Sequence, residues 1–160
     1  MVKQLCWEDV QEGTEVTPLP KIATTQMLVQ WAGASGDLNP LHYEHNFAVG
    51  QGQPTVIVHG QLKRAWLVQL MTDWIGPKGV LKKFGCQFRG TDTPRGMSMI
   101  GFPKDGETWQ CKGKVTKKYV EEDDHLVDCE IWLENGSGVK TTPGHATAKL
   151  PARASGTCCT

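Results

Sequence analysis

Residues 60–75 read G-Q-L-K-R-A-W-L-V-Q-L-M-T-D-W-I and form the one long helical segment of the 160-residue chain. Gly76 and Pro77 follow directly, and both residue types end helices. At about 100° per residue, the apolar side chains from Leu62 to Ile75 fall on all sides of the helix and form no single stripe. A helix with this pattern is buried, so we expect other structure to wrap around it.

The second half of the chain contains candidates for this wrapping. Four runs of strand length with partial apolar alternation are residues 80–89, 109–120, 125–134 and 139–150. Connectors that contain Gly, Pro, Asn and Asp separate the runs, which favours neighbours joined by hairpin-like loops. We therefore predict an α+β domain in which a curved antiparallel sheet wraps around one central helix.

A shorter helix and a long loop precede the central helix. Thr24 or Thr25 can cap the shorter helix, and Gly33 and Gly36 end it. Residues 37–54 are then predicted to be a loop.

The size and charge of the chain exclude several classes of protein. At 17.6 kDa the chain is one domain, which we assign to residues 1–150, followed by a flexible tail over residues 151–160. The 17 Lys and Arg residues balance 17 Asp and Glu residues, so no basic footprint for nucleic acid is present. No apolar stretch approaches the ~20 residues that span a bilayer, and residues 1–9 lack a secretory signal. We expect a cytoplasmic protein without nucleic-acid or membrane partners.

Neither the cysteines nor the Asn135-Gly136-Ser137 sequon marks a secreted protein. The six cysteines, at positions 6, 86, 111, 129, 158 and 159, match neither C-x-x-C pairs nor a small disulfide scaffold. We predict that at least the first four are reduced and mostly buried, because free Cys behaves as a small hydrophobe. The sequon is better explained as an Asn-Gly turn.

The residues that can move protons are concentrated in residues 31–49, which read W-A-G-A-S-G-D-L-N-P-L-H-Y-E-H-N-F-A-V. Asp37 and His42 are five residues apart, which fits neither one helix face nor one strand face. Only the bend at Asn39-Pro40 could bring the two side chains together. A water held between a carboxylate and an imidazole can lose a proton to one group while the other donates a proton to a substrate. Alternatively, Asp37 caps the turn and His42 fills space at its end.

Two other kinds of chemistry are less well supported by the same stretch. Ser35 is expected to bond the turn backbone. We do not expect it to be a nucleophile, because no G-x-S-x-G elbow surrounds it. His42 and His45 form H-x-x-H beside Glu44, but the H-E-x-x-H order and further ligands are missing. We therefore expect no metal site and no cofactor.

The string S-G-D-L-N-P-L-H at residues 35–42 closely resembles the hydratase motif of the MaoC-like family, which includes R-specific enoyl-CoA hydratases and related acyl-carrier-protein dehydratases. The resemblance extends to Val58-His59-Gly60, to C-Q-F-R at residues 86–89 and to G-x-A-T-A-K-L-P at residues 144–151. These strings span nearly the whole chain and occur in the same order as in the family. It implies a single hotdog domain, with a curved antiparallel sheet around one central helix and an overhang segment that carries the motif.

The resemblance also implies a reaction and a set of site residues. Such enzymes add water reversibly and syn to a trans-2-enoyl thioester and form the (R)-3-hydroxyacyl thioester. Asp37 and His42 would activate the water, and the N–H of Gly60 at the start of the central helix would stabilise the enolate-like oxygen. The residues assigned to substrate binding are Asn39, His59, Gln61 and Arg89. Of these, Asn39 would also hold the loop, and His59 could line the pocket or instead cap the central helix.

Two features depart from the usual pattern of the family. Gln61 follows His59-Gly60 where an apolar residue, commonly Met, is usual, and a polar side chain there could reshape the acyl tunnel. Residues 90–107 are longer than the P-x-G-D connector of many relatives and resemble the extended loop of some fatty-acid-elongation dehydratases. The Met and Phe side chains of this connector could contact a partner or the acyl chain.

The resemblance implies an acyl-CoA or acyl-carrier-protein thioester as substrate. Cations near the tunnel mouth would bind the phosphates of the carrier, or would only be surface charges. The candidates are Lys63, Arg64, Lys82, Lys83 and Arg89.

We expect a homodimer, because a single hotdog domain leaves one sheet edge and one wall of its tunnel uncovered. Alternatively, the chain is the catalytic subunit of a heteromeric dehydratase that includes a second hotdog chain. An acyl-CoA thioesterase shares the fold and the ligand but fits the motif less well.

Overall fold

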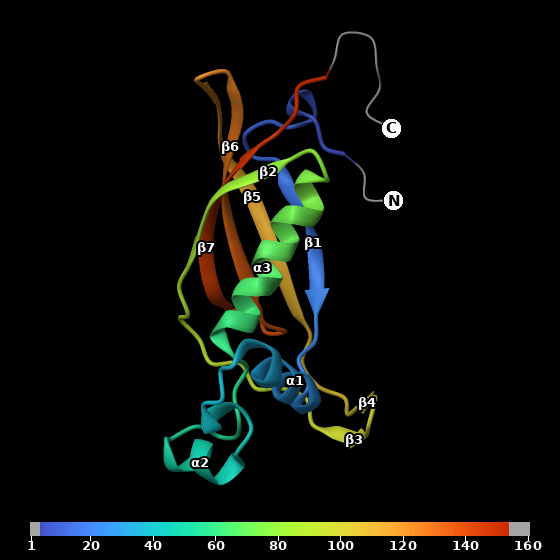
Figure 1. Cartoon of the computed structure of the whole chain (residues 1–160), viewed down its shortest axis with the longest axis vertical. Helices are drawn as coiled ribbons and strands as arrows, with labels where there is room; N and C mark the ends of the chain where they lie inside the picture. Colours follow the sequence, from blue (N-terminus) through green and yellow to red (C-terminus); the bar gives the residue numbers. More distant parts are fainter. Residues whose placement is uncertain (1–3, 154–160) are drawn as a thin grey trace.

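The computed structural model describes residues 4–153 as a curved sheet with one long helix along it (Figure 1). In chain order, the helices are η1 (Trp7–Asp9), α1 (Thr25–Ser35), η2 (Pro40–His42), α2 (His45–Gly50) and α3 (Gly60–Ile75). The strands are β1 (Glu15–Lys21), β2 (Val80–Cys86), β3 (Met97–Met99), β4 (Phe102–Pro103), β5 (Trp109–Glu121), β6 (Asp124–Glu134) and β7 (Lys140–Lys149).

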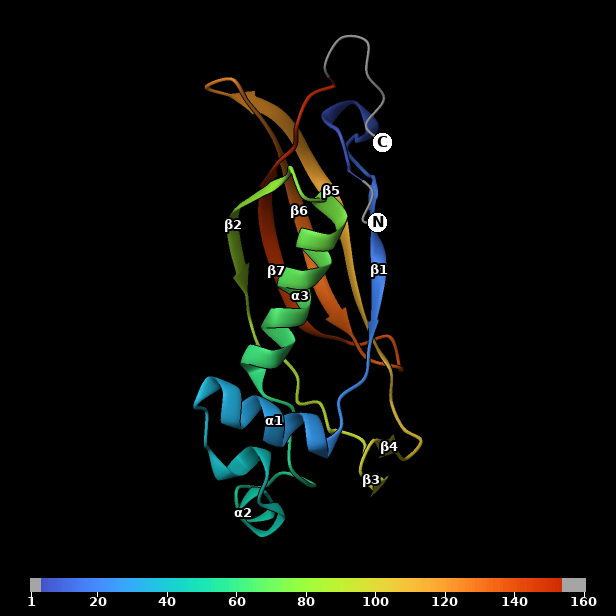
Figure 2. The same ribbon diagram turned by 45° about the vertical axis from the view of Figure 1, so that its right-hand side comes forward.

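The main sheet is antiparallel and has the strand order β1-β5-β6-β7-β2. The sheet curves around α3, which runs along its inner side in both ribbon views (Figure 1 and Figure 2). Side chains that face α3 alternate along the strands, as in β5, where Trp109, Cys111 and Val115 are buried. The predicted α+β arrangement, with an antiparallel sheet around one helix, is confirmed.

The central helix α3 has the bounds that the sequence predicts. Leu67 is fully buried, and the Trp66 ring lies near the Trp109 ring of β5, with 6.3 Å between the centroids. Gln61 and Thr72 on the opposite side are exposed. Within this chain the sheet therefore covers one side of α3 and leaves the other side open.

The sequence does not predict β1, because Pro18 and Pro20 interrupt it. Proline lacks an N–H for the ladder and is tolerated mainly in edge strands and bulges. β1 is an edge strand, and its register against β5 shifts between Val16 and Leu19. The other edge strand, β2, ends at Cys86 and not at residue 89 as predicted.

Residues 25–50 form an overhang beside the N-terminal end of α3, built from α1, η2 and α2 (Figure 2). Thr24, one of the two predicted caps, accepts a hydrogen bond at Oγ1 from the first turn of α1, and Gly36 ends this helix with a φ of +75°. The predicted loop over residues 37–54 contains two short helices instead. The side chain of Asn39 caps η2 and the side chain of Glu44 caps α2, because each accepts a hydrogen bond from a main-chain N–H in the first turn of its helix.

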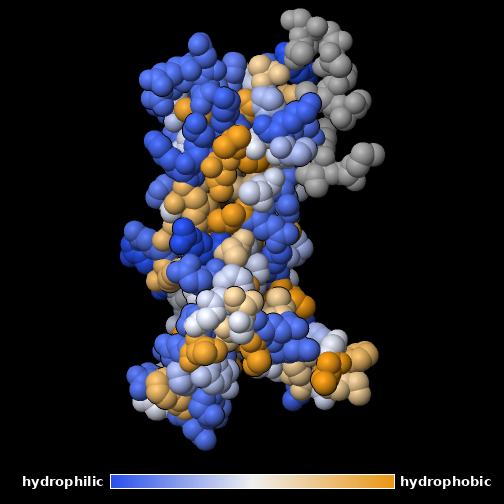
Figure 3. Space-filling model, viewed as in Figure 1, coloured by the Kyte–Doolittle hydropathy of each residue, from blue (hydrophilic) through white to orange (hydrophobic). Residues whose placement is uncertain are grey.

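The long connector over residues 90–107 carries the β3–β4 hairpin. The hairpin packs beside α1, where the Gly101 N–H donates to Gln26 Oε1 at 3.2 Å. Met99, Ile100 and Phe102 near its tip are 62%, 87% and 61% exposed. Apolar atoms gather over this hairpin at the lower right of Figure 3. Their contact with a partner or with an acyl chain stays a prediction.

The cysteines follow the prediction at three of the four positions. Cys86, Cys111 and Cys129 have free thiols, and burial raises the pKa of Cys111 and of Cys129 to about 12. Cys6 is disulfide-bonded, so the prediction of a reduced thiol is wrong there. Cysteine spacing in the sequence does not report which sulfurs the fold brings within bonding distance.

The structure describes only the first three residues of the predicted tail, residues 151–153. Trp7 N–H donates to the Pro151 carbonyl at 2.9 Å, and Arg153 N–H donates to Glu8 Oε2 at 3.0 Å. Residues 154–160 of the predicted tail lie outside the described residues, so a flexible tail stays a prediction. Among residues 4–153, no helix has both the length and the apolar character needed to cross a membrane.

Candidate active site

The start of α3, the overhang and residues 88–91 enclose a cleft of about 270 Å³. Its lining residues are His42, Ile57, Val58, Gly60, Lys63, Phe88, Arg89, Gly90 and Thr91. The cleft contains His42 and Gly60, two of the three predicted catalytic residues, and the third, Asp37, lies beside His42. Tertiary folding thus brings together three separate segments of the chain.

Asp37 and His42 face each other across the bend at Asn39-Pro40. His42 Nε2 lies 3.9 Å from Asp37 Oδ2. This distance is too long for a direct hydrogen bond, but it allows one water oxygen to contact both atoms at ordinary hydrogen-bond distances. The Asp37 side chain is 39% exposed and the His42 side chain 10%, so solvent reaches the pair from the carboxylate side.

The turn around Asp37 is held by other side chains. Asn39 Oδ1 accepts from the first turn of η2 at 3.1 Å, and Ser35 Oγ accepts from the Asp37 N–H at 3.2 Å, as predicted for Ser35. Asp37 contributes one contact within the turn, from Oδ1 to the Asn39 N–H at 3.5 Å, which is at the limit of a hydrogen bond. Its Oδ2 atom is therefore available to His42, which favours the catalytic interpretation over a purely structural cap.

The tautomer of His42 follows from its contact with the main chain. His42 Nδ1 lies 2.8 Å from the carbonyl oxygen of Ile57. A carbonyl can only accept a hydrogen bond, so Nδ1 carries the proton. In the neutral ring, Nε2 then has a free lone pair on the side of Asp37. His42 is oriented to accept a proton at Nε2.

His59 lies against the ring of His42. The two rings stack with 3.7 Å between centroids and an interplanar angle of 21°. His59 is fully buried, and within residues 4–153 neither of its ring nitrogens has a hydrogen-bond partner. Burial lowers the pKa of His59 and the neighbouring His42 lowers it further, against a smaller opposing effect of Asp37. A neutral His59 therefore supports the His42 ring and does not itself line the cleft.

The lowered pKa of His59 predicts how the stability of the fold depends on pH. As the pH falls through 6.5, the unfolded chain binds a proton at His59 more readily than the folded chain, because folding lowers the pKa of His59, so the free energy of unfolding decreases. The slope due to this residue reaches at most about 1.4 kcal/mol per pH unit. We expect denaturant unfolding between pH 5 and pH 8 to give a shallower pH dependence for His59→Gln than for the native chain. His145→Gln, at an exposed histidine, should keep the native slope; equal slopes for all three proteins would contradict the prediction.

Gly60 is the first residue of α3, and its N–H belongs to the donors of the first turn that a helix leaves unpaired. The ring of Phe88 lies directly against this glycine. A Cβ atom at residue 60 would lie 2.9, 3.0 and 3.1 Å from three atoms of the Phe88 ring. Glycine is therefore required for the ring to approach the start of the helix this closely.

The predicted substrate-binding residues occupy different places. Arg89 lines the cleft, and its guanidinium donates hydrogen bonds to Gln87 Oε1. Asn39 is exposed and caps η2, and Gln61 is exposed outside the cleft lining. Within residues 4–153, Arg89 is the one member of the predicted set that reaches the cleft. The substrate contacts of all four residues stay predictions.

The candidate phosphate-binding cations also differ in their surroundings. Lys63 is 2% exposed and forms an ion pair with Asp92, so it is not available to a carrier phosphate. Lys82 pairs with Asp124 at 3.2 Å. Arg64 is exposed and lies over the Phe84 ring, with 5.8 Å from its Cζ to the ring centroid.

The donor atoms of Asp37, His42 and His59 lie within 4.8 Å of one another, which raises the question of a metal ion. The lone pairs of imidazole nitrogens lie in the ring planes, and the two rings are nearly parallel and stacked, so their lone pairs do not converge on one point. His42 Nδ1 is also engaged by Ile57. The arrangement is suited to proton transfer by His42 and fits a metal ion poorly.

Sequence reasoning does not find two contributions to the cleft. The Ile57 carbonyl that sets the His42 tautomer is a main-chain group, and no residue type signals it. Phe88 stands in the C-Q-F-R string at residues 86–89, but its contact with Gly60 depends on the fold.

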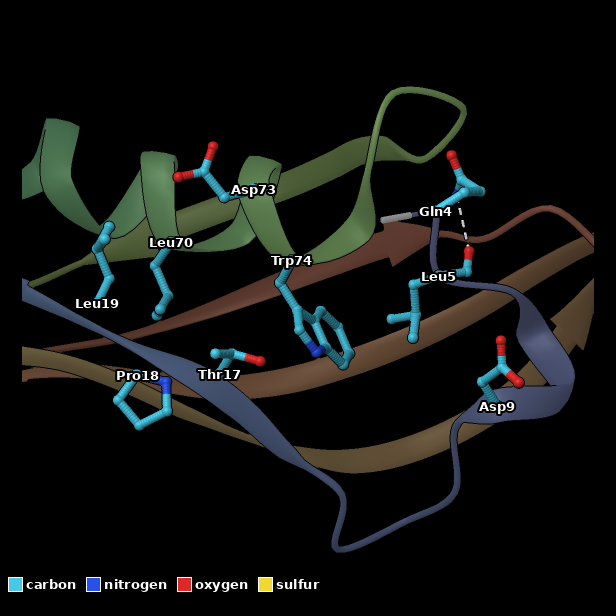
Figure 4. A pocket seen from close by; sticks show the side chains of 9 residues that line it. All are labelled: Gln4, Leu5, Asp9, Thr17, Pro18, Leu19, Leu70, Asp73 and Trp74. Carbon is cyan, nitrogen blue, oxygen red and sulfur yellow. Dashed lines mark hydrogen bonds between the residues drawn. The ribbon is translucent and has the colours of Figure 1, made fainter. Parts of the chain in front are cut away.

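A larger groove, of about 490 Å³, lies away from these residues. It runs between the C-terminal half of α3, β1 and the N-terminal segment, and Figure 4 shows Trp74 and Leu70 projecting from α3 toward β1. Asp9 at its rim pairs with Arg153, and Gln4 donates to the Leu5 and Ile75 carbonyls. The smaller cleft at His42 is therefore the better candidate for chemistry.

Comparison with known proteins identifies the family of the chain. Residues 9–91, just over half of the chain, match the family described as "MaoC like domain". The chain belongs to the MaoC-like family. Asp37, His42 and Gly60 all lie within the matched residues of this MaoC-like chain. A sequence comparison with curated proteins gives no match.

Solved structures share the fold of the MaoC-like chain. The (R)-hydratase from A. caviae involved in PHA biosynthesis is 21% identical, with a TM-score of 0.74 over 90% of this chain and 99% of that chain. R-hydratase PhaJ1 from Pseudomonas aeruginosa is 19% identical, with a TM-score of 0.78 over 95% and 89%. The ChsH1-ChsH2 complex from Mycobacterium tuberculosis contributes a chain that is 20% identical, with a TM-score of 0.71 over 88% and 98%. These similarities confirm the hotdog fold.

Proposed function

We propose that this MaoC-like chain reversibly hydrates trans-2-enoyl thioesters to (R)-3-hydroxyacyl thioesters. The observation that carries the proposal is the 3.9 Å approach of His42 Nε2 to Asp37 Oδ2 beside the cleft that holds Gly60. Two groups that can share one water are what general acid–base catalysis of hydration needs. Two of the solved structures with the same fold are (R)-hydratases by name, which supports this class of reaction.

In the proposed reaction, a water held between Asp37 and His42 loses a proton to His42 Nε2 while its oxygen bonds to C3 of the substrate. The electrons of the C2–C3 double bond shift toward the thioester, whose carbonyl oxygen becomes negative. The N–H of Gly60, at the positive end of the α3 dipole, stabilises this oxygen. The proton on His42 then passes to C2. One water has been added across the double bond, and His42 is neutral again.

We also propose that the carrier is CoA or an acyl-carrier protein and that the chain works as a dimer. Arg89 at the cleft and the exposed Arg64 are the cations placed to bind a carrier phosphate. The free edges of the sheet at β1 and β2 offer places for a second copy or a second hotdog chain. One of the similar chains comes from such a two-chain complex, ChsH1-ChsH2. The presence of both Asp37 and His42 supports a catalytic role for this chain in either assembly.

The proposed activity is tested with purified protein and a panel of trans-2-enoyl-CoA substrates graded by acyl length. We expect loss of the absorbance of the conjugated enoyl thioester, with (R)-3-hydroxyacyl-CoA as product. Activity only on co-expression with a second hotdog chain would favour the heteromeric alternative. Release of free thiol with the double bond intact would favour a thioesterase, and no turnover in any of these assays would contradict the proposal.

A further inference from the structure

Lys63 and Asp92 form a buried ion pair beside the cleft. Lys63 Nζ lies 2.7 Å from Asp92 Oδ2, and the two side chains are only 3% and 1% exposed. Nζ also donates to the Gly90 carbonyl at 2.9 Å. The other carboxylate oxygen, Asp92 Oδ1, accepts from Trp109 Nε1 of β5 at 2.9 Å. Both oxygens of Asp92 are therefore bonded inside the protein, one to α3 and one to the sheet.

A buried ion pair of this kind is a poor source of stability. Removing two charges from water costs free energy that their attraction often does not recover, and apolar residues of similar size can replace such pairs without loss. Lys63 also stands on α3, in a helix whose other buried residues are apolar. The pair therefore calls for an explanation other than stability.

The main chain of Asp92 holds the segment that carries two groups of the cleft. Its carbonyl accepts from the Val58 N–H at 2.8 Å. Val58 follows Ile57, whose carbonyl orients His42 Nδ1, and precedes His59 and Gly60. A displacement of Asp92 would therefore move the His42 ring and the Gly60 N–H relative to each other.

The Phe88 ring, which we call the Phe88 wall, lies close to the same ammonium. Lys63 Nζ lies 5.9 Å from the centroid of the Phe88 ring, which covers Gly60, and it bonds the Gly90 carbonyl two residues further on. One buried charge thus connects α3, the Phe88 wall and Asp92.

We propose that the Lys63–Asp92 pair positions residues 57–60 for catalysis. Lys63 and Asp92 are positioning residues, because they act through Val58, Ile57 and the Phe88 wall. The inference rests on the proposed hydration reaction. Misplacing catalytic groups by about 1 Å can cost about 10²-fold in rate, so the effect of the pair should be measurable in kcat.

The test replaces both charges at once. In Lys63→Met/Asp92→Asn the buried charges are gone, and the Asn side chain still offers an oxygen to Trp109. Each single variant leaves one buried charge unpaired, so we expect the single variants to unfold at lower denaturant than the double variant. In the folded double variant we expect kcat for a trans-2-enoyl-CoA to fall about 10- to 100-fold while KM changes less than about threefold.

Two further measurements keep the test informative if the double variant folds poorly. Trp109→Phe removes the bond to Asp92 Oδ1 without changing any charge, and we expect a smaller loss of kcat in the same direction. Amide hydrogen exchange at Val58 should accelerate in both proteins, which reports the position of residues 57–60 without any assay of activity. The control is Lys112→Met/Glu134→Gln, which removes an ion pair on the outer face of the sheet and should leave kcat and Val58 exchange unchanged.

The outcomes separate this inference from the proposed function. A native chain that hydrates no enoyl thioester contradicts the proposed function, whereas Val58 exchange still reports whether the pair holds the segment. A folded double variant with native kcat and native Val58 exchange overturns the inference. Native kcat with accelerated exchange also overturns it, since the segment would then be held by the pair without consequence for the reaction.

Discussion

Asp37→Asn and His42→Ala are each expected to lower kcat for hydration by about 10²- to 10⁴-fold. His42→Ala removes the Nε2 lone pair that accepts the proton of water in the proposed reaction. Asp37→Asn removes the carboxylate charge, 3.9 Å from Nε2, which in the proposed reaction holds the water and stabilises the protonated ring. Steady-state kinetics with a trans-2-enoyl-CoA would measure both effects.

The control for this pair is His45→Ala. His45 is an exposed histidine three residues after His42, and its Nδ1 lies 3.2 Å from Thr55 Oγ1 and outside the cleft. Its replacement should leave kcat within about twofold, because surface substitutions away from the site have small effects. Asp37 and His42 act on the same water in the proposed reaction, so the double variant should be little slower than the slower of the two single variants. A native rate in either single variant would remove that residue from the mechanism.

Gly60→Ala is expected to lower kcat/KM by about 10²-fold. The new Cβ would lie 2.9 to 3.1 Å from three atoms of the Phe88 ring, so either the ring or the start of α3 must move. In the proposed reaction, such a movement displaces the Gly60 N–H from the thioester oxygen or changes the shape of the cleft beside it. The measurement is kcat and KM for the same substrate, with folding checked by the unfolding midpoint.

Gly33→Ala is the matched control, because a Cβ at residue 33 of α1 meets no atom within 4 Å. The Gly33→Ala protein should keep native kinetics, and its free energy of unfolding should rise slightly, because Ala is more favourable than Gly in a helix by up to about 1 kcal/mol. Phe88→Ala, added to Gly60→Ala, removes the contact and should restore part of the lost kcat/KM. A Gly60→Ala protein with native kinetics would show that the close approach of Phe88 has no role in the reaction.

The sequence predicts the main elements of the fold because their signals are local. The apolar residues of 60–75 and the stop at Gly76-Pro77 locate α3 to the residue. Of the candidate ends of α1, Thr24 and Gly36 are confirmed, whereas Gly33 lies inside the helix. β1 escapes prediction because its two prolines argue against a strand unless the strand is known to lie at an edge. Edge position is a property of the whole sheet.

Local sequence also predicts one part of the candidate site, whereas another part depends on the fold. The bend at Asn39-Pro40 and the spacing of Asp37 and His42 predict a shared site, and the structure places the two side chains 3.9 Å apart. His59 and Lys63 are different, because the sequence suggests a substrate contact for one and a phosphate contact for the other. The fold instead stacks His59 on His42 and buries Lys63 against Asp92.

The sequence by itself determined the central helix, the antiparallel strands that cover it and the acid and imidazole of the motif. These features depend on residue type and on spacing over a few positions, which the sequence contains in full. Only the tertiary structure decided the tautomer of His42, the contact of Phe88 with Gly60 and the burial of Lys63. Each depends on an atom contributed from a distant segment, such as the carbonyl of Ile57 or the carboxylate of Asp92, and such atoms meet only when the chain is folded.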